Sequence, residues 1–195
     1  DLILLMPVRV TKAKNIEYAL RVLAALKRDY SKPRLVLTGP PDPHDAGNME
    51  YFRSLLDLRE ALGLEHEMHF VYESGPDPAQ PYQIGSQVVG DLFRVSDVMF
   101  MPSHREGFGM PVLEAGLVGL QVVSTDVPAS QEIARDDVVV FDASQPAQET
   151  ADLIRAAVEA NPVSRLRSFV RTTYTWEAIF DRKINPLLKK GGKLP

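Results

Sequence analysis

The sequence predicts an α/β fold: a Rossmann-like, doubly wound parallel sheet of about six strands with helices on both faces. Short apolar runs of strand length alternate along the chain with amphipathic stretches of helical length. Strands that are apolar almost throughout are typical of parallel sheets covered on both faces. A chain of 195 residues, 45% of them hydrophobic, can bury one sizeable core. We therefore expect one domain over residues 1–188 and a flexible tail over residues 189–195.

The strands are expected where the apolar runs are bounded by turn residues. The first, Leu2-Ile3-Leu4-Leu5-Met6, opens the chain, and the second and third are each followed by a proline-rich loop, at residues 40–43 and 75–78. The fourth ends at Pro102. The predicted strands are residues 2–6, 34–38, 68–72, 98–101, 121–124 and 138–141.

The helices are expected in the amphipathic stretches between and after these strands. Trp176, Ile179, Phe180 and Ile184 share one face of the last helix, which favours a stripe facing the core. The predicted helices are residues 16–29, 48–62, 86–95, 111–118, 129–134, 147–160, 163–173 and 176–188.

Composition excludes several classes of function. The chain has no cysteine, so disulfides and thiolate metal sites are excluded, and its net charge of −4 provides no overall basic field for nucleic acid. No apolar run reaches the ~20 residues that span a bilayer. The four histidines form no helix-borne H-E-x-x-H pattern, so we expect no metal. We expect a cytoplasmic protein and leave peripheral membrane attachment of the full-length protein open.

The segment from Pro102 to Ala115 is the most informative part of the chain. It follows a strand-type run and leads into a helix, so it lies at the carboxyl end of a strand. Gly107 and Gly109 allow a tight turn and the close approach of a ligand, and Pro111 suits the first turn of a helix. The N–H groups at such a helix start attract an anion, such as a diphosphate.

Two carboxylates, Glu106 and Glu114, flank this glycine turn. They would repel a diphosphate, so we place them on hydroxyl groups of a sugar or a ribose, which donate strong hydrogen bonds to carboxylates. Diphosphate and hydroxyl groups together indicate a nucleotide-sugar site. A solvated loop carboxylate and a helix-capping acid are the alternative interpretation, and that alternative would prevail if the two residues stood alone.

The expected topology brings a second group of residues to the same place. In a sheet of order 3-2-1-4-5-6, strands one and four are neighbours at the switch point, and the ligand binds beyond their carboxyl ends. Arg9 and Lys14 follow strand one. We therefore expect them to face the Glu106 loop.

The Glu106 to Glu114 segment resembles the E-x7-E signature of retaining GT-B glycosyltransferases of the group 1 or family 4 type, in their C-terminal donor-binding domain. The resemblance implies that Glu106 lies near the donor sugar and that Glu114 binds the ribose. The diphosphate would be held by the loop residues Gly107, Phe108, Gly109 and Met110.

A second resemblance is to the R-x4-K-N element of that family, here Arg9 to Asn15. It implies that Arg9 and Lys14 neutralise the donor diphosphate and stabilise the leaving group, and it assigns no role to Lys12. The chain departs from the family pattern before Glu132, where residues 127–131 replace the usual paired glycines.

The resemblance implies transfer of a hexose from a nucleoside-diphosphate sugar to an unidentified acceptor, with retention of configuration and without a metal. Because the chain begins at Asp1, directly before a strand, we expect a fragment. The resemblance implies that the missing part is an N-terminal acceptor domain of the same chain.

Other activities remain open. A sugar phosphorylase, a sugar-nucleotide epimerase and a non-catalytic nucleotide-binding module are all compatible with this fold. A hydrolase is less favoured, because the helix start stabilises the ionised form of Glu114. Neither a dinucleotide-binding G-x-G-x-x-G after the first strand nor a P-loop is present.

Overall fold

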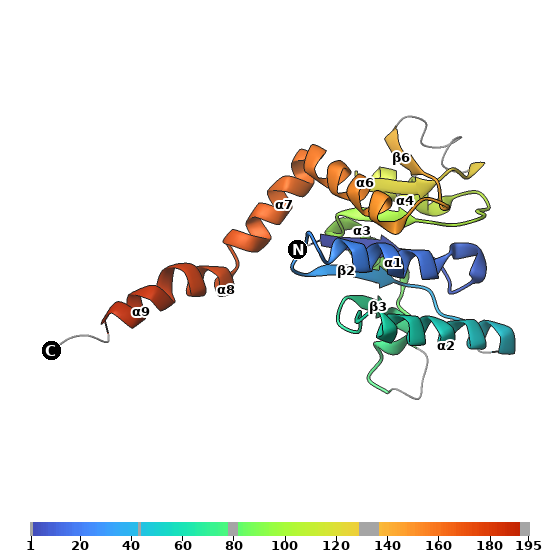
Figure 1. Ribbon diagram of the computed structural model, residues 1–195, viewed down its shortest axis with the longest axis horizontal. Coiled ribbons are helices and arrows are strands. Elements are labelled where there is room, and N and C mark those ends of the chain that lie inside the picture. The colour runs from blue at the N-terminus through green and yellow to red at the C-terminus, as the bar shows by residue number, and fades with distance from the viewer. Residues whose placement is uncertain (1, 43, 78–81, 129–136, 192–195) are drawn as a thin grey trace.

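The chain forms a six-stranded, fully parallel sheet in the order β3-β2-β1-β4-β5-β6. The computed structural model describes residues 2–42, 44–77, 82–128 and 137–191 (Figure 1). The fold class and the strand order predicted from the sequence are confirmed. The strands are β1 (Leu2–Met6), β2 (Pro33–Leu37), β3 (Met68–Phe70), β4 (Val98–Met101), β5 (Gln121–Thr125) and β6 (Val138–Phe141).

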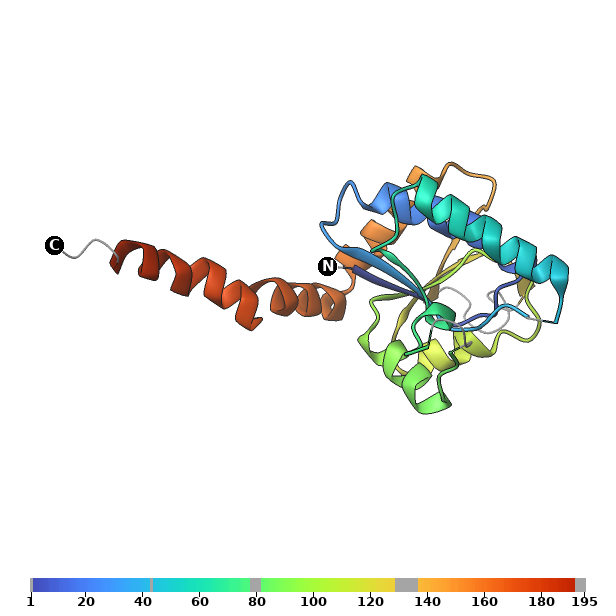
Figure 2. The ribbon, with the colours of Figure 1, turned by 90° about the horizontal axis from the view of Figure 1, so that it is seen from below.

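Helices cover both faces of the sheet, as Figure 2 shows. On one face lie α1 (Ile16–Leu26), α2 (Ala46–Ala61) and α6 (Ala147–Ala160), with α1 packed between the other two. On the other face lie α3 (Ser86–Val95) and α4 (Met110–Leu117). Two 3₁₀ turns, η1 (Lys12–Lys14) and η2 (Val71–Glu73), follow β1 and β3.

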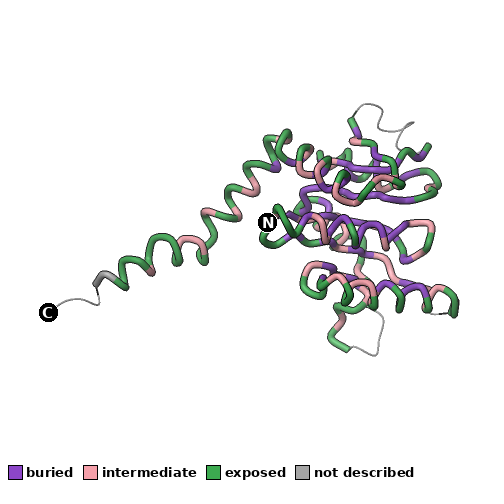
Figure 3. Tube along the Cα trace, in the orientation of Figure 1, coloured by how far each residue is buried: buried purple, intermediate pink, exposed green. Residues whose placement is uncertain are grey.

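Each face of the sheet has its own hydrophobic core, because alternate residues of a strand point to opposite sides. In β4, Phe100 belongs to the core under α1 and α6, whereas Met99 and Met101 belong to the core under α3 and α4. All three are buried. Figure 3 shows the buried residues concentrated in the sheet and on the inner sides of the helices.

Several predicted boundaries differ from the structure. The third strand ends at Phe70, two residues early, because the chain enters η2 at once. Helix α2 begins at Ala46, two residues early, because Asp45 caps it by accepting the N–H bonds of Gly47 and Asn48 at 2.9 and 3.1 Å. Helix α1 ends at Leu26 instead of residue 29. The helix predicted over 129–134 lies outside the described residues.

The C-terminal helices project away from the sheet as an arm (Figures 1 and 2). Residue Arg171 holds the base of this arm to the body, since its Nη1 lies 2.7 Å from Asp97 Oδ2 and its Nη2 donates to the Val95 carbonyl at 2.6 Å. Arg167 donates to the Ser96 carbonyl at 2.7 Å. The arm consists of α7 (Pro162–Thr173), α8 (Trp176–Ile179), the π-helical turn η4 (Phe180–Ile184) and α9 (Asn185–Gly191).

The apolar stripe of the arm does not face a core, so that expectation is wrong. The side chain of Trp176 is 82% exposed, and Phe180 and Ile184 are also exposed. The helices extend past the sheet, where no described residue covers them. The helix predicted over 176–188 forms as α8, η4 and α9, interrupted by the wide π-helical turn η4 just before Pro186, which lacks the N–H that a regular helical ladder needs.

Candidate functional site

The loops that follow β1 and β4 lie side by side at the carboxyl edge of the sheet. These strands are neighbours, with Leu4 opposite Val98 and Leu5 opposite Met99. Beyond the strands, the His104 N–H donates to the Ala13 carbonyl at 2.9 Å. The two sequence motifs therefore follow neighbouring strands, and a backbone hydrogen bond also connects their loops.

Lys14 and Glu106 form an ion pair across these loops. Lys14 Nζ lies 2.7 Å from Glu106 Oε2, and the two side chains are 19% and 6% exposed. The expectation that Lys14 faces the Glu106 loop is confirmed. An ammonium group has three donors, so Lys14 can hold Glu106 and still bind a phosphate oxygen.

Asn15 explains why Lys14 is directed at this loop. It adopts the left-handed conformation, with φ 50°, between η1 and α1, and it is buried. Asparagine tolerates this conformation better than most residues. Its carbonyl accepts the N–H bonds of Tyr18 and Ala19, which starts α1 directly after the turn that carries Lys14.

Gly39, two residues after the end of β2, makes room for the loop that carries Arg9. A Cβ atom at Gly39 would lie 2.5 Å from the Val8 carbonyl oxygen and 2.8 Å from the backbone of Arg9. The Gly39 N–H also donates to the Val8 carbonyl at 3.0 Å. The space is therefore filled by the chain itself.

Arg9 is exposed, and within the described parts of the chain it makes no hydrogen bond or ion pair. The structure thus brings Lys14, and not Arg9, into contact with Glu106.

Lys12 lies close by, with its Nζ 6.0 Å from the centre of the Tyr51 ring. The Tyr51 hydroxyl donates to Glu17, and burial together with that carboxylate raises the pKa of Tyr51.

The second oxygen of Glu106 accepts a hydrogen bond from a residue that the sequence reasoning missed. Ser103 Oγ lies 2.5 Å from Glu106 Oε1. Thr125, the last residue of β5, donates in turn to the Ser103 carbonyl at 2.6 Å. Serine and threonine are common in loops, so only their positions at the ends of neighbouring strands could have pointed to them.

The glycine turn leaves its backbone open. Gly109 has φ 81° and precedes α4, a conformation that favours glycine. The N–H groups of Gly107, Phe108, Gly109 and Met110 donate to no acceptor among the described residues. A Cβ atom at Gly107 would meet nothing within 4 Å.

The side chains around this turn face solvent. Phe108 is 71% exposed and Met110 is 54% exposed. Glu114, the fifth residue of α4, is exposed as well. These groups, and the open N–H groups beside them, are accessible to a ligand.

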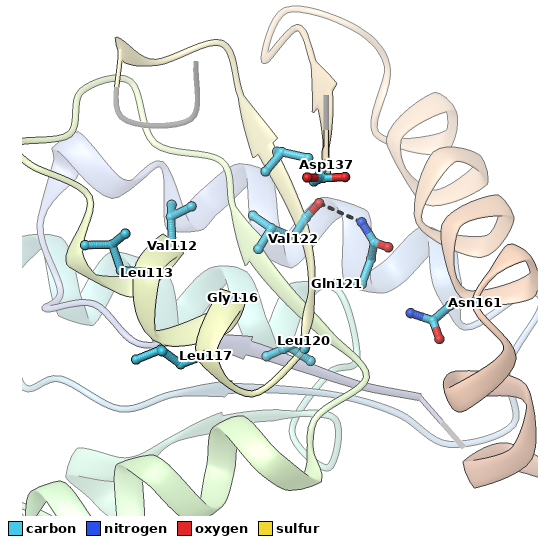
Figure 4. Close-up of a pocket in the computed structure, with 11 residues that line it drawn as sticks. Val112, Leu113, Gly116, Leu117, Leu120, Gln121, Val122, Asp137 and Asn161 are labelled. Atoms are coloured by element: carbon cyan, nitrogen blue, oxygen red, sulfur yellow. Dashed lines mark hydrogen bonds between the residues drawn. The ribbon is translucent and has the colours of Figure 1, made fainter. Parts of the chain in front are cut away.

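Two cavities flank this region at different ends of the sheet. One of about 570 Å³ lies beside the motif at the carboxyl ends of β4 to β6, where Ser103, His104, Asp126 and Asp142 line it. Another of about 760 Å³ lies at the opposite ends of β5 and β6, between α4 and the start of α7. Its lining is mainly apolar, and although Val112 and Leu113 contribute to it, none of the charged motif residues Arg9, Lys14, Glu106 and Glu114 does (Figure 4).

Neither a cluster of metal ligands nor a membrane-spanning helix occurs in the described part of the chain. It contains no group of three or more His, Cys, Asp or Glu residues that could hold a metal ion. None of its helices is both long and apolar enough to cross a membrane.

Comparison with known families gives one match over most of the chain. The family described as "Glycosyl transferases group 1" matches residues 1–176. A D-inositol 3-phosphate glycosyltransferase of Saccharomonospora viridis is 35% identical over 133 residues, which are 67% of this chain and 28% of that protein. One of the same description from Salinispora tropica is 27% identical over 95% of this chain and 37% of that protein. The chain thus spans well under half the length of these curated relatives.

Solved structures share the fold. The C-terminal domain of a glycosyl transferase group 1 family protein from Francisella tularensis has a TM-score of 0.67 at 21% identity, covering 90% of this chain and 87% of that one. Anabaena HepE in complex with UDP and glucose has a TM-score of 0.63 at 20% identity, covering 82% of this chain and 39% of that one.

Proposed function

The chain belongs to the glycosyl transferases group 1 family, and we propose on this basis that it forms the donor site of a retaining glycosyltransferase. The reaction would transfer a hexose from a nucleoside-diphosphate sugar to an acceptor. The observation that carries the proposal is the Lys14–Glu106 ion pair beside the open N–H groups of residues 107–110.

The open turn supports binding of the diphosphate. Unpaired N–H groups at a helix start attract an anion, and the empty space at Gly107 lets it approach the backbone closely. Arg9 and Lys14 add positive charge from the neighbouring loop. As the bond to the sugar breaks, negative charge grows on the leaving phosphate, and these preorganised groups stabilise it. The proposed reaction therefore uses no metal.

The carboxylates would hold the two hydroxylated parts of the donor. Glu106 is held by Lys14 and Ser103, so it is placed to accept a hydroxyl of the hexose and to stabilise positive charge at the anomeric carbon. Glu114, on the exposed side of α4, would accept the ribose hydroxyls. Retention implies that the acceptor attacks from the face that the diphosphate leaves.

Acceptor binding would fall to a second, N-terminal domain of the same protein, because the curated relatives are much longer than the matched region. The first donor to test is a UDP-sugar, since the HepE structure holds UDP and glucose, and a trehalose-6-phosphate enzyme structure from E. coli holds UDP-2-fluoro glucose. A cytoplasmic location remains a prediction.

The test is the thermal stability of this chain with UDP, GDP, ADP and dTDP, each with and without Mg²⁺. A ligand at about 100 times its Kd adds ~2.7 kcal/mol, or roughly 5–10 °C for a domain of this size. We expect one nucleotide to raise the Tm without a metal. The rise should shrink in Glu114→Ala but persist in Glu65→Ala, which removes an exposed carboxylate elsewhere.

Two results would count against the proposal. If no nucleotide raises the Tm, the chain has no donor site of its own. If the rise needs Mg²⁺, the cationic side chains and N–H groups do not replace a metal. Turnover to inorganic phosphate, or formation of an epimer, in the presence of a bound nucleotide sugar would redirect the proposal to a phosphorylase or an epimerase.

A further inference from the structure

We propose that Ser103 is a positioning residue that sets the orientation of the Glu106 carboxylate toward the donor sugar, and that Thr125 holds Ser103 in place. The inference rests on the proposed function, because it assigns Glu106 to the sugar. It assigns a role to Ser103 and Thr125, which are not among the residues that define the two motifs.

The Glu106 carboxylate accepts hydrogen bonds from two sides. Ser103 Oγ donates to Oε1 at 2.5 Å, and Lys14 Nζ donates to Oε2 at 2.7 Å. Since the two donors come from different loops and engage different oxygens, rotation of the carboxylate about its last bond would break both contacts. A carboxylate has about four acceptor positions. Two therefore remain for hydroxyl groups of a ligand.

Ser103 itself is fixed by its surroundings. It is 1% exposed, so bulk water cannot replace Glu106 as the hydrogen-bond partner of its hydroxyl. Thr125 is 5% exposed and donates to the Ser103 carbonyl at 2.6 Å, and more weakly to that of Met101 at 3.4 Å. The resulting chain of contacts links the ends of β5, β4 and β1 through one carboxylate.

A purely structural serine would not need this partner. Ser96 is also fully buried, and its hydroxyl donates at 2.6 Å to the Leu92 carbonyl of its own helix. That bond satisfies the hydroxyl locally and touches no motif residue. Ser103 instead donates to the carboxylate that the family resemblance places at the sugar. Ser96 is therefore a matched control for burial and hydrogen bonding.

The experiment measures how much the sugar changes nucleotide affinity. Calorimetry on this chain gives the Kd of UDP and of UDP-glucose, or of GDP and GDP-mannose if UDP does not bind. The ratio of the sugar-nucleotide Kd to the nucleotide Kd isolates contacts to the sugar. It is compared in the unaltered chain, Ser103→Ala, Thr125→Val, Glu106→Ala, the Ser103→Ala/Glu106→Ala double variant and Ser96→Ala.

We expect Ser103→Ala to raise this ratio about tenfold, the scale of one lost hydrogen bond to a charged group, while the Kd of the nucleotide alone stays unchanged. Thr125→Val should raise it less, because it acts through Ser103. Ser96→Ala should leave it unchanged. The double variant should match Glu106→Ala alone, because Ser103 acts only through Glu106.

Different failures overturn different statements. An unchanged ratio in Ser103→Ala, or additive losses in the double variant, would overturn the positioning role and leave the donor site standing. An unchanged ratio in Glu106→Ala would remove Glu106 from the sugar. No binding of any of these four compounds would overturn the proposed function and this inference with it.

Discussion

Lys14 and Glu106 lie 92 positions apart in the sequence, yet Lys14 Nζ and Glu106 Oε2 are 2.7 Å apart at the edge of the sheet. Both side chains are largely shielded from solvent, so little water screens the pair. The ion pair connects the two motifs at the point where strands β1 and β4 run side by side. It is therefore the contact on which both stability and donor binding can be tested.

Lys14→Met should lower the free energy of unfolding by about 1.5–3 kcal/mol, because it leaves a shielded carboxylate with Ser103 as its only described partner. Urea titration measures the change. Lys27→Met is the control, since the Lys27–Glu67 pair is more exposed and should contribute only about 1 kcal/mol or less. Equal losses in the two variants would mean that the Lys14–Glu106 pair is no stronger than a surface contact.

Gly107→Ala should leave the stability within about 0.5 kcal/mol, because the added methyl group meets no protein atom. Nucleotide binding, in contrast, should weaken at least about tenfold if a diphosphate occupies that space. Calorimetry with the nucleotide that raises the Tm measures this. Gly116→Ala is the control: it also adds a methyl group in open space, but near the other end of α4, so it should not affect binding. Equal binding by both variants would argue against a ligand at residue 107.

Gly39→Ala should destabilise the chain by about 1–3 kcal/mol, because its Cβ would push against the backbone of Val8 and Arg9, and backbone cannot yield as a side chain can. Displacement of Arg9 should also weaken nucleotide binding. Gly90→Ala is the contrasting variant. It lies inside α3 with only the end of the Arg94 side chain nearby, at 3.6 Å, so it should stabilise by about 0.5–1 kcal/mol. Thermal and urea unfolding of both variants measure these changes in stability.

His69 should make stability depend on pH. Burial lowers the pKa of His69, and the positive charges of Arg34 and Arg59 lower it further, while the His66 carbonyl and Glu67 oppose the shift. As the pH falls, His69 is therefore protonated in the unfolded chain first, at about pH 6.5. The contribution of neutral, buried His69 to the free energy of unfolding is complete above that pH. It is lost as the pH falls toward the pKa of His69 in the folded chain.

Urea midpoints between about pH 7.5 and pH 5 should consequently fall more steeply for the unaltered chain than for His69→Gln. His66→Gln replaces an exposed histidine three positions away and should keep the steep dependence. Parallel curves for the unaltered chain and His69→Gln would show that another group controls the pH response.

The sequence predicted the sheet well because its signals are local. Each strand is a short apolar run, and each run must be buried whatever surrounds it. Boundaries were less accurate where a cap or a turn decided them, as at Asp45 and in the turn after Phe70. The apolar stripe of the C-terminal arm was misplaced because hydrophobicity favours burial without specifying which surface provides it.

The motif residues were also predictable, through glycine spacing and family resemblance, but their partners were not. The sequence places Lys14 and Glu106 after neighbouring strands. Only the folded chain joins them, directs Ser103 to the other oxygen of Glu106, and leaves Arg9 without a hydrogen bond or ion pair in the described residues. Such contacts depend on the register of strands and on loop conformations, including the left-handed turn at Asn15.

The sequence by itself thus determined the strand order and the edge of the sheet at which the motifs lie, because hydrophobic periodicity and right-handed crossovers restrict the topology. Tertiary structure decided which atoms meet there. Gly39 serves the packing of the Arg9 loop, Gly107 faces open space, and Glu106 is held by two donors from separate loops. These distinctions are made over distances of a few ångströms between residues far apart in the chain, which no local pattern encodes.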